Sequence, residues 1–284
     1  MGSYSELYRY GCVILEDAGI DDALLDARLL LEYICGTDIN HLYAHGDQCV
    51  SDDKADRYRR VIAERADHKP LQYITGTQDF MGLDFRVTKD VLIPRQDTEI
   101  LAEEALKNLH DGMRILDMCT GSGCILISLL HYSNDCSGIG IDISPAALAV
   151  ARDNAEKLGV SSIDFIESSL FDKCPDGKFD MIVSNPPYIK TDVIKTLMPE
   201  VKEHEPMEAL DGSGDGLLFY RKIAKEASRY LYGGADLFFE IGYDQGKEVS
   251  GIMTDAGYKG VTVVKDYSGN DRVVYGYRSE YSDV

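Results

Sequence analysis

A segment of four residues, Asn185-Pro186-Pro187-Tyr188, contains the residue types needed to hold and orient an NH₂ group. The Asn185 side chain offers a carbonyl oxygen as a hydrogen-bond acceptor. Pro186 offers its backbone carbonyl and lacks the N–H that would otherwise compete as a donor. Two acceptors directed at one planar NH₂ group would orient it, and the ring of Tyr188 would give it a flat surface. For these four residues taken alone, a rigid Pro-Pro turn with Tyr188 packed on it is the simpler interpretation.

A second segment, residues 117–123, has the composition of a turn that binds a ligand. It reads Asp117, Met118, Cys119, Thr120, Gly121, Ser122 and Gly123. The glycines allow the backbone to approach a ligand closely, and the start of the following helix offers unpaired N–H groups. Asp142 stands 25 residues after Asp117, at the end of the next predicted strand, where a carboxylate can accept both hydroxyl protons of a ribose. The combination favours a nucleoside ligand over a turn that only joins a strand to a helix.

The turn also narrows the kind of nucleoside. It lacks the complete G-x-G-x-x-G spacing of a dinucleotide site, and the chain has no G-x-x-x-x-G-K-[ST] loop for ATP. Asp117 places a carboxylate near the turn, which suits the sulfonium and amino group of S-adenosylmethionine better than a phosphate. The cysteines and histidines show no zinc-ligand spacing. We therefore expect S-adenosylmethionine as the cofactor and no metal.

The pattern of helices and strands from Asp97 onward would bring both segments to one edge of a sheet. Strands are predicted at 113–118, 137–141, 163–166, 179–183, 235–241, 258–265 and 272–277, and helices at 97–109, 123–132, 145–158, 217–232 and 245–256. This alternation is typical of a mainly parallel, Rossmann-like α/β sheet with helices on both faces. The last two strands are too close for a crossover helix and should pair antiparallel. Asn185 follows the fourth strand, at the carboxyl edge where ligands bind.

The residues before this region show a different pattern of apolar and polar side chains. Helical spacing and capping residues predict four short helices within residues 1–75, which should form a small bundle. Apolar residues such as Phe80 and Phe85 alternate with polar ones, so residues 76–93 are predicted to form a β-hairpin linker. The ligand-binding α/β domain would then occupy residues 94–284.

Composition and charge limit the kinds of partner that the protein is expected to have. The chain has 44% apolar and 27% charged residues, which is ordinary for a globular protein, and a formal net charge of −20. A chain this acidic, with no basic block, is poorly suited to gripping nucleic acid and better suited to a protein partner. Without a long apolar segment or a signal-peptide core, we expect a cytoplasmic protein with no membrane contact. Its seven scattered cysteines are expected to be reduced.

These motifs resemble the HemK/PrmC family along nearly the whole chain. The resemblance rests on Asn185-Pro186-Pro187-Tyr188, on the turn from Asp117 to Gly123, and on Asp142-Ile143-Ser144-Pro145-Ala146-Ala147-Leu148. Further similar segments are residues 26–31, 70–76, 94–99, 240–242, 245–246 and 269–274. The family methylates the glutamine of the Gly-Gly-Gln loop in class 1 peptide chain release factors. The resemblance therefore implies a class I S-adenosylmethionine-dependent methyltransferase whose helical domain and linker help to bind the release factor.

The resemblance also implies a role for each site residue. Asp142 would bind the ribose and Leu170 would lie by the adenine, while Asp117, Cys119, Thr120, Gly121, Ser122 and Gly123 would surround the methionine part. Asn185, Pro186, Pro187 and Tyr188 would hold the substrate glutamine, with Asn185 also next to the cofactor; of these, Asn185, Pro186 and Tyr188 would be catalytic. Cys119 stands where the family usually has a glycine, Ser169 where an Asp is common, and Gln96 where Pro is frequent.

Three other functions fit parts of the sequence. Adenine-N6 methyltransferases of nucleic acids share the Asn-Pro-Pro-Tyr motif, but would need a target-recognition region and positive charge. A ribosomal-protein glutamine methyltransferase would use the same chemistry on another protein. A binding module that retains the fold without activity is disfavoured by the intact motif at Asn185.

Overall fold

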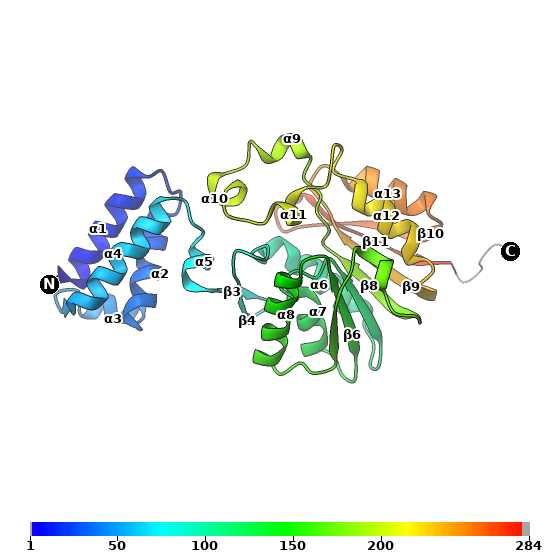
Figure 1. Ribbon diagram of the computed structural model, residues 1–284, viewed down its shortest axis with the longest axis horizontal. Coiled ribbons are helices and arrows are strands. Elements are labelled where there is room, and N and C mark those ends of the chain that lie inside the picture. The colour runs from blue at the N-terminus through cyan, green and yellow to red at the C-terminus, as the bar shows by residue number, and fades with distance from the viewer. Residues whose placement is uncertain (1, 280–284) are drawn as a thin grey trace. The chain divides into compact units, whose positions relative to one another are not determined.

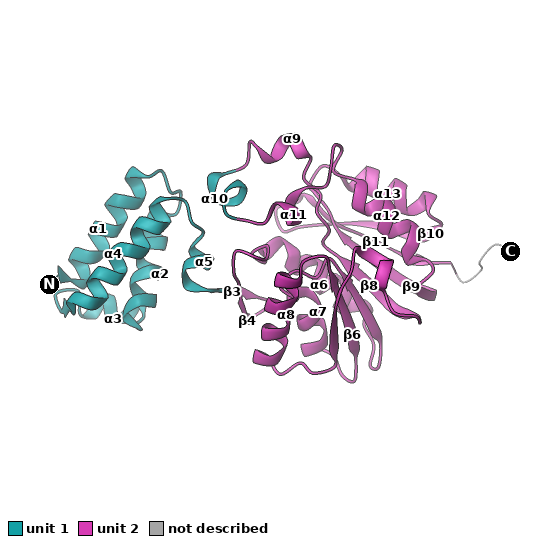
Figure 2. Cartoon of the chain, viewed as in Figure 1, with its two compact units in different colours: residues 1–77, 198–204 teal, residues 78–197, 205–284 magenta. Residues whose placement is uncertain are grey.

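The computed structural model describes residues 2–279, which form two compact units (Figure 2). Unit 1 comprises residues 1–77 together with 198–204, and unit 2 comprises residues 78–197 and 205–284. The chain therefore leaves unit 2 for one short segment, residues 198–204, and then returns to it. None of the described helices is long and apolar enough to cross a membrane.

Unit 1 is a helical bundle, and the four predicted helices are present (Figure 1). They are α1 (Tyr4–Asp17), α2 (Ala23–Cys35), α3 (Ile39–Ala44) and α4 (Asp52–Ala66), followed by the short α5 (Leu71–Thr75). The strands β1 (Gly2–Ser3) and β2 (Cys49–Val50) pair antiparallel beside them. Ser3 caps α1 in a reciprocal capping box with Glu6, so two backbone N–H groups at this helix end are satisfied by side chains.

The core of unit 1 is apolar, with a few buried polar contacts. Tyr58 is fully buried, and its hydroxyl donates to the Ala27 carbonyl at 3.0 Å. Arg65 pairs with Asp26 at 2.7 Å and with Glu200 at 2.8 Å. Glu200 belongs to α10 (Pro199–Lys202), so this buried guanidinium fastens the inserted segment 198–204 to the bundle.

Unit 2 contains a seven-stranded sheet in the order β10-β11-β9-β8-β5-β6-β7. The strands are β5 (Arg114–Met118), β6 (Ser137–Asp142), β7 (Ile163–Glu167), β8 (Phe179–Ser184), β9 (Leu231–Glu240), β10 (Tyr258–Lys265) and β11 (Asp271–Arg278). The first five are parallel to one another, and β11 pairs antiparallel with both β9 and β10. The predicted Rossmann-like α/β class and the antiparallel final pair are confirmed.

Helices cover both faces of this sheet (Figure 1). The helices α6 (Gln96–Asn108), α7 (Cys124–His131) and α8 (Pro145–Lys157) pack on one face, and α12 (Leu218–Ala227) and α13 (Gly246–Asp255) on the other. Ile115 of β5 belongs to the first core and Leu116 to the second, as alternation along a strand requires. Burial on both faces fixes the register of β5 and therefore the position of the turn that follows it.

One short helix was not predicted, and one predicted helix boundary differs from the structure. Residues 71–75 form α5, and the hairpin strands are β3 (Thr77–Phe80) and β4 (Leu83–Arg86), whose Phe80 and Phe85 are buried in the core of unit 2. The helix predicted over 217–232 is wrong at its end, since α12 stops at Ala227 and Leu231 begins β9. Leu231 is fully buried and pairs with Phe179 of β8, so sheet pairing overrides the helical pattern there.

Several short helices lie in the segments that the sequence pattern left as loops. They are η1 (Leu170–Lys173), α9 (Thr191–Ile194), α10 and α11 (Met207–Leu210). Each has only four residues, which is too short for an apolar periodicity to be recognised.

Candidate active site

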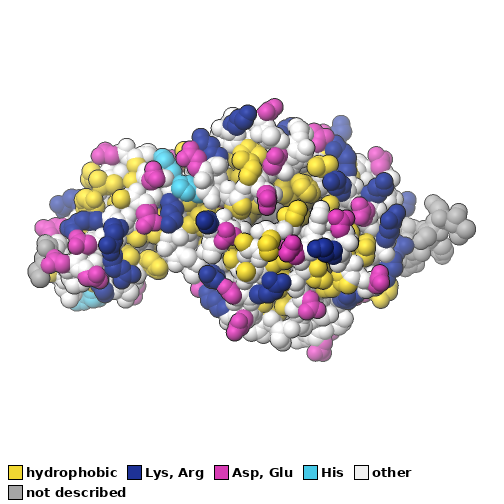
Figure 3. All heavy atoms as spheres, viewed as in Figure 1, with side chains coloured by type: hydrophobic (Ala, Val, Ile, Leu, Met, Phe, Trp, Pro, Cys, Tyr) yellow, Lys and Arg dark blue, Asp and Glu magenta, His cyan; other side chains and the backbone are white. Residues whose placement is uncertain are grey.

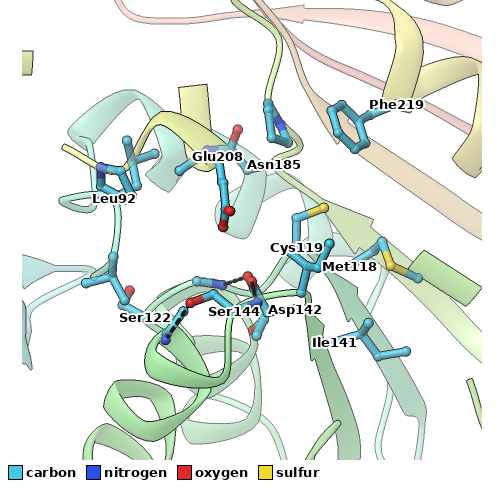
Figure 4. Close-up of a pocket in the computed structure, with 18 of the residues that line it drawn as sticks. Leu92, Met118, Cys119, Ser122, Ile141, Asp142, Ser144, Asn185, Glu208 and Phe219 are labelled. Carbon is cyan, nitrogen blue, oxygen red and sulfur yellow. Dashed lines mark hydrogen bonds between the residues drawn. The ribbon is translucent and has the colours of Figure 1, made fainter. Parts of the chain in front are cut away.

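The carboxyl edge of the sheet in unit 2 contains a cavity of about 420 Å³ (Figure 4). Its wall comes from the turn after β5, the end of β6, residues 168–170 and the segment after β8, together with residues 90–94 and 206–211. Figure 4 shows Asp142 and Asn185 on opposite sides of the cavity, with the Glu208 side chain extending into it. The volume and the mainly apolar lining are those of a small-molecule site.

The structure brings most of the predicted site residues together. Those that line the cavity are Cys119, Thr120, Gly121, Ser122, Asp142, Leu170, Asn185 and Pro187. Asp117, Gly123, Pro186 and Tyr188 lie in the same segments but do not themselves form the wall. The two motifs therefore meet at one cavity, although Asp117 and Tyr188 act from behind its surface.

The turn after β5 requires three residues with positive φ. Cys119, Gly121 and Gly123 have φ values of 66°, 55° and 80°. A Cβ at position 123 would lie 2.8 Å from Ile127 Cδ1, so glycine is needed there for space as well as for conformation. The Thr120 N–H donates to the Ile141 carbonyl at 2.9 Å, which joins the turn to the end of β6. Backbone geometry thus explains why the turn is built largely from small residues.

Cys119 occupies the first of these left-handed positions although it is not glycine. A non-glycine residue in this region costs on the order of 1 kcal/mol in backbone strain. Burial and the neighbouring Asp142 and Asp117 carboxylates raise the pKa of the Cys119 thiol, so it stays protonated. Cys119 therefore adopts the left-handed conformation itself and adds an uncharged sulfur to the cavity wall (Figure 4).

Asp142, the last residue of β6, is held by backbone donors on both carboxylate oxygens. The Gly121 N–H donates to Oδ2 and the Ser144 N–H to Oδ1, each at 2.9 Å. Burial raises the pKa of Asp142, and these two N–H groups oppose the rise. Each oxygen keeps a further lone pair, so the carboxylate can accept two hydroxyl groups from the cavity side without losing its own support.

Asp117 is fully buried at the base of the turn, and its Oδ2 accepts the Thr120 hydroxyl at 2.6 Å. Its Oδ1 has no hydrogen-bond partner among the described residues. Burial raises the pKa of Asp117 to about 7. A buried carboxylate with one unmatched oxygen, close behind the turn, fits a cofactor that carries positive charge better than one that carries phosphate.

This burial predicts a pH dependence of stability. An unfolded aspartate titrates near pH 4, so from about pH 4 to pH 7 the folded chain keeps a proton that the unfolded chain has lost. The free energy of unfolding contributed by Asp117 must then fall as pH rises through this window. Asp117→Asn should reduce the loss of stability between pH 5 and pH 7 by about 2 kcal/mol, measured by urea unfolding. If the free energy of unfolding depended on pH in the same way in both proteins, this assignment would be contradicted.

The segment after β8 places Asn185 in the cavity wall and fixes its side chain. The Asn185 Nδ2 donates to the Thr98 hydroxyl at 3.4 Å, and this orientation turns Oδ1 away from Thr98. Pro186 and Pro187 are buried, and the Tyr188 hydroxyl donates to Glu240 Oε1 at 3.4 Å. Ser184, directly before Asn185, donates to the Met118 carbonyl at 2.6 Å and so joins the ends of β8 and β5. The geometry leaves the Asn185 carbonyl as an acceptor for a ligand.

Two glycines allow the return segment to pack against the backbone of this motif. A Cβ on Gly212 would lie 2.6 Å from Tyr188 Cα and 2.9 Å from the Pro187 carbonyl oxygen. Gly216, with φ of 74°, approaches the Tyr188 carbonyl in the same way. Gln245 Nε2 also donates to that carbonyl, at 3.2 Å. The position of the motif therefore depends on backbone contacts that a side chain would block.

Gly212→Ala should displace the motif and lower kcat by a factor on the order of 10 to 100, because small misplacements of positioning groups are costly. Gly214→Ala is the matched control, since a Cβ there would meet no atom within 4 Å. Steady-state kinetics of both variants, with cofactor affinity measured by calorimetry, test this. Equal kcat values for the two variants would show that the packing of Gly212 does not position the motif.

Several cavity residues were not predicted from the sequence. Thr98 comes from the start of α6, and the segment 206–211 is held in place by the ion pair between Arg95 and Glu205 at 2.5 Å. Asn154 of α8 donates to the carbonyls of Ser122 and Arg86, which ties the turn to the hairpin. Thr98 lies in the segment 94–99, which the sequence identified only as a segment similar to the family and not as part of the site.

Comparison with known proteins places these features in a family. Residues 6–76 match the model of the PrmC N-terminal domain, and residues 109–231 match a methyltransferase domain. The release factor glutamine methyltransferases of Geobacter sulfurreducens and Agrobacterium fabrum are each 43% identical to this chain, with 92% of both chains covered. The chain belongs to the release factor glutamine methyltransferase family. The identification accounts for the cavity as a site for S-adenosylmethionine, the cofactor on which this family's methyltransferase domain depends.

A solved methyltransferase from Pyrococcus furiosus has the same fold as this family member at 18% identity, with a TM-score of 0.52. The match covers 99% of the Pyrococcus furiosus protein and 79% of this chain. Within the family member described here, the motif segments 94–99, 240–242 and 269–274 meet behind the cavity. Arg272 pairs with Asp97 at 3.0 Å and with Asp266 at 3.2 Å, next to Glu240. The ion pair between Arg272 and Asp97 therefore joins two of these motif segments directly, next to Glu240 in the third.

Proposed function

We propose that this enzyme methylates the side-chain amide nitrogen of the glutamine in the Gly-Gly-Gln motif of class 1 peptide chain release factors. The observation that carries the proposal is the orientation of Asn185. Its NH₂ group is engaged by Thr98, so its Oδ1 is left to accept an N–H from a substrate amide. Asp142 stands across the same cavity, where it would hold the ribose of the cofactor.

S-adenosylmethionine supplies the methyl group as an electrophile on a positively charged sulfur. An amide nitrogen is a weak nucleophile because its lone pair is delocalised into the carbonyl. Asn185 Oδ1 and the Pro186 carbonyl would each accept one N–H of the substrate amide and direct its lone pair toward the methyl group. The methyl group would leave the sulfur without the electron pair of its S–C bond, and that pair would stay on sulfur as the N–C bond forms. The positive charge on nitrogen is then lost with one N–H proton to water.

The remaining residues would hold the two substrates. Cys119, Thr120, Gly121, Ser122 and Gly123 form or support the turn that would receive the methionine part, with Asp117 behind it. Leu170 would pack beside the adenine. Pro187 would give the planar amide a rigid surface, and Tyr188 would support that surface from behind. Under this assignment, substitutions in the segment 185–188 should mainly change turnover. Substitutions at residues 117–123 and 142 should mainly change cofactor affinity.

The partner and the location follow from the same proposal. Release factors act in translation, so the enzyme would work in the cytoplasm. Acidic and basic side chains are mixed over the face of unit 2 shown in Figure 3. This pattern, with the net charge of −20, supports a protein substrate over a nucleic acid.

Transfer of a labelled methyl group to three acceptors tests the proposal. Purified release factor, ribosomal proteins and adenine-containing DNA are each incubated with the enzyme and methyl-labelled S-adenosylmethionine. We expect label on the release factor, and none on a release factor whose Gly-Gly-Gln glutamine is replaced by alanine. Label on ribosomal protein or DNA alone would instead support one of the two alternative substrates.

We further propose that the helical bundle docks the release factor. Its second helix exposes two adjacent large apolar side chains, with 55% of Leu24 and 44% of Leu25 accessible to solvent. The double substitution Leu24→Ser, Leu25→Ser should lower kcat/KM for the intact release factor about tenfold and leave kcat/KM for a short Gly-Gly-Gln peptide unchanged. An equal loss on both substrates would show that these leucines do not contribute to docking.

A further inference from the structure

A buried carboxylate lies behind the substrate end of the cavity. Glu240 is the last residue of β9, next to the end of β8, and only 1% of its surface is exposed. Its Oε1 accepts the Tyr188 hydroxyl at 3.4 Å, and the Thr98 hydroxyl lies near enough to the same carboxylate to lower its pKa. Thr98 in turn accepts the Asn185 Nδ2–H at 3.4 Å. One carboxylate therefore supports two of the four motif residues, one directly and one through a hydroxyl.

The direction of these hydrogen bonds follows from the chemistry of each group. An ionised carboxylate can only accept, and a hydroxyl has a single proton to donate. When Thr98 donates that proton to Glu240, its oxygen faces Asn185 as an acceptor. The Asn185 side chain must then present its NH₂ group to Thr98 and its carbonyl oxygen to the opposite side. If Thr98 were free to donate to Asn185, the amide could turn over and show a donor to the substrate.

Resting on the proposed function, we propose that Glu240 is a positioning residue that acts through Thr98 to keep the Asn185 carbonyl facing the substrate amide. Its hydrogen bond with Tyr188 holds the other end of the motif. Glu240 touches neither the cofactor nor the substrate in this arrangement. Its effect on the reaction is to fix which end of an asparagine amide is presented.

The surroundings of Glu240 argue against a role in stability alone. Its Oε2 has no hydrogen-bond partner among the described residues, and the nearby Arg272 forms its ion pairs with Asp97 and Asp266. A buried carboxylate with an unmatched oxygen is unfavourable for folding. Burial raises the pKa of Glu240 to about 7, with Thr98, Arg272 and Tyr188 opposing the rise. Experiments are therefore set at pH 8, where the carboxylate is mainly ionised.

The test compares substitutions that change hydrogen-bond direction with substitutions that do not. Thr98→Val removes the hydroxyl at nearly constant shape, Thr98→Ser retains it, and Glu240→Gln replaces the carboxylate by a group that can also donate. With saturating cofactor and release factor, Thr98→Val and Glu240→Gln should each lower kcat about tenfold. The kcat of Thr98→Ser should stay within twofold of the wild-type value. Cofactor affinity, measured by calorimetry, should be unchanged in all three.

The decisive comparison repeats Thr98→Val and Glu240→Gln in an Asn185→Ala background. If both residues act through Asn185, neither should lower kcat further once Asn185 is absent. A tenfold loss that persists in the Asn185→Ala background would overturn the proposal, because it would show an independent role. Retention of full kcat by Thr98→Val would overturn it as well.

A readout that does not depend on activity separates this inference from the proposed function. The side-chain NH₂ resonances of Asn185, assigned by their disappearance in Asn185→Ala, should shift in Thr98→Val and in Glu240→Gln but not in Thr98→Ser. Unshifted resonances would contradict the positioning role even in an active enzyme. If these shifts occur but the original enzyme labels no release factor, the positioning role stands and the proposed function fails.

Discussion

Replacing Asn185 by alanine is expected to lower kcat for release factor methylation by a factor on the order of 10²–10³. The Asn185 carbonyl would accept an N–H that becomes more acidic as positive charge grows on the attacked nitrogen, so it stabilises the transition state more than the ground state. Cofactor affinity and melting temperature should change little, because Asp142 and the turn after β5 are untouched. Single-turnover kinetics with saturating release factor measure the effect.

Asn185→Asp is the matched variant. It keeps an acceptor of the same size but loses the N–H donor to Thr98, so its kcat should lie between those of Asn185→Ala and the original enzyme. Near-normal turnover of Asn185→Ala would show that the Asn185 carbonyl is not the group that aligns the substrate.

Asp142→Ala should weaken binding of S-adenosylmethionine by at least about 100-fold, since each lost charge-assisted hydrogen bond costs roughly 1.5–3 kcal/mol. Asp142 also anchors the N–H groups of Gly121 and Ser144, so part of the loss would come from a looser turn. Calorimetry measures the affinity, and far-UV circular dichroism checks that the sheet remains intact.

A ligand that lacks one ribose hydroxyl separates the two contributions. The 2′-deoxy analogue of S-adenosylhomocysteine should bind the original enzyme more weakly than S-adenosylhomocysteine does. Asp142→Ala should bind the two ligands with nearly equal affinity. Full discrimination retained in Asp142→Ala would place the ribose elsewhere in the cavity.

The sequence was informative where a local pattern determines the structure. The β5 turn, with Gly121 and Gly123, and the acid at the end of β6 could be located because strand ends and positive φ leave recognisable residue types. The position of Asn185 after β8 followed from the order of parallel strands, whose carboxyl ends meet at one edge. Those patterns were enough to predict that the two motifs share one site.

Contacts between distant segments left no comparable pattern. Thr98 and Glu240 are 142 residues apart along the chain (240 − 98) and meet only when α6 and β9 have packed. The segment 206–211 contains only the four-residue helix α11, and its place beside the cavity depends on the pair between Arg95 and Glu205. The end of α12 was mispredicted because sheet pairing at Leu231 outweighs the local preference for helix.

The proposed reaction is tested most directly by locating the transferred methyl group with fragmentation mass spectrometry. Release factor is incubated with the enzyme and S-adenosylmethionine, digested, and compared with a sample treated with Asn185→Ala. We expect one added methyl group on the side-chain amide of the Gly-Gly-Gln glutamine, nearly absent from the Asn185→Ala sample. A methyl group on any other residue, or equal modification by the two enzymes, would contradict it.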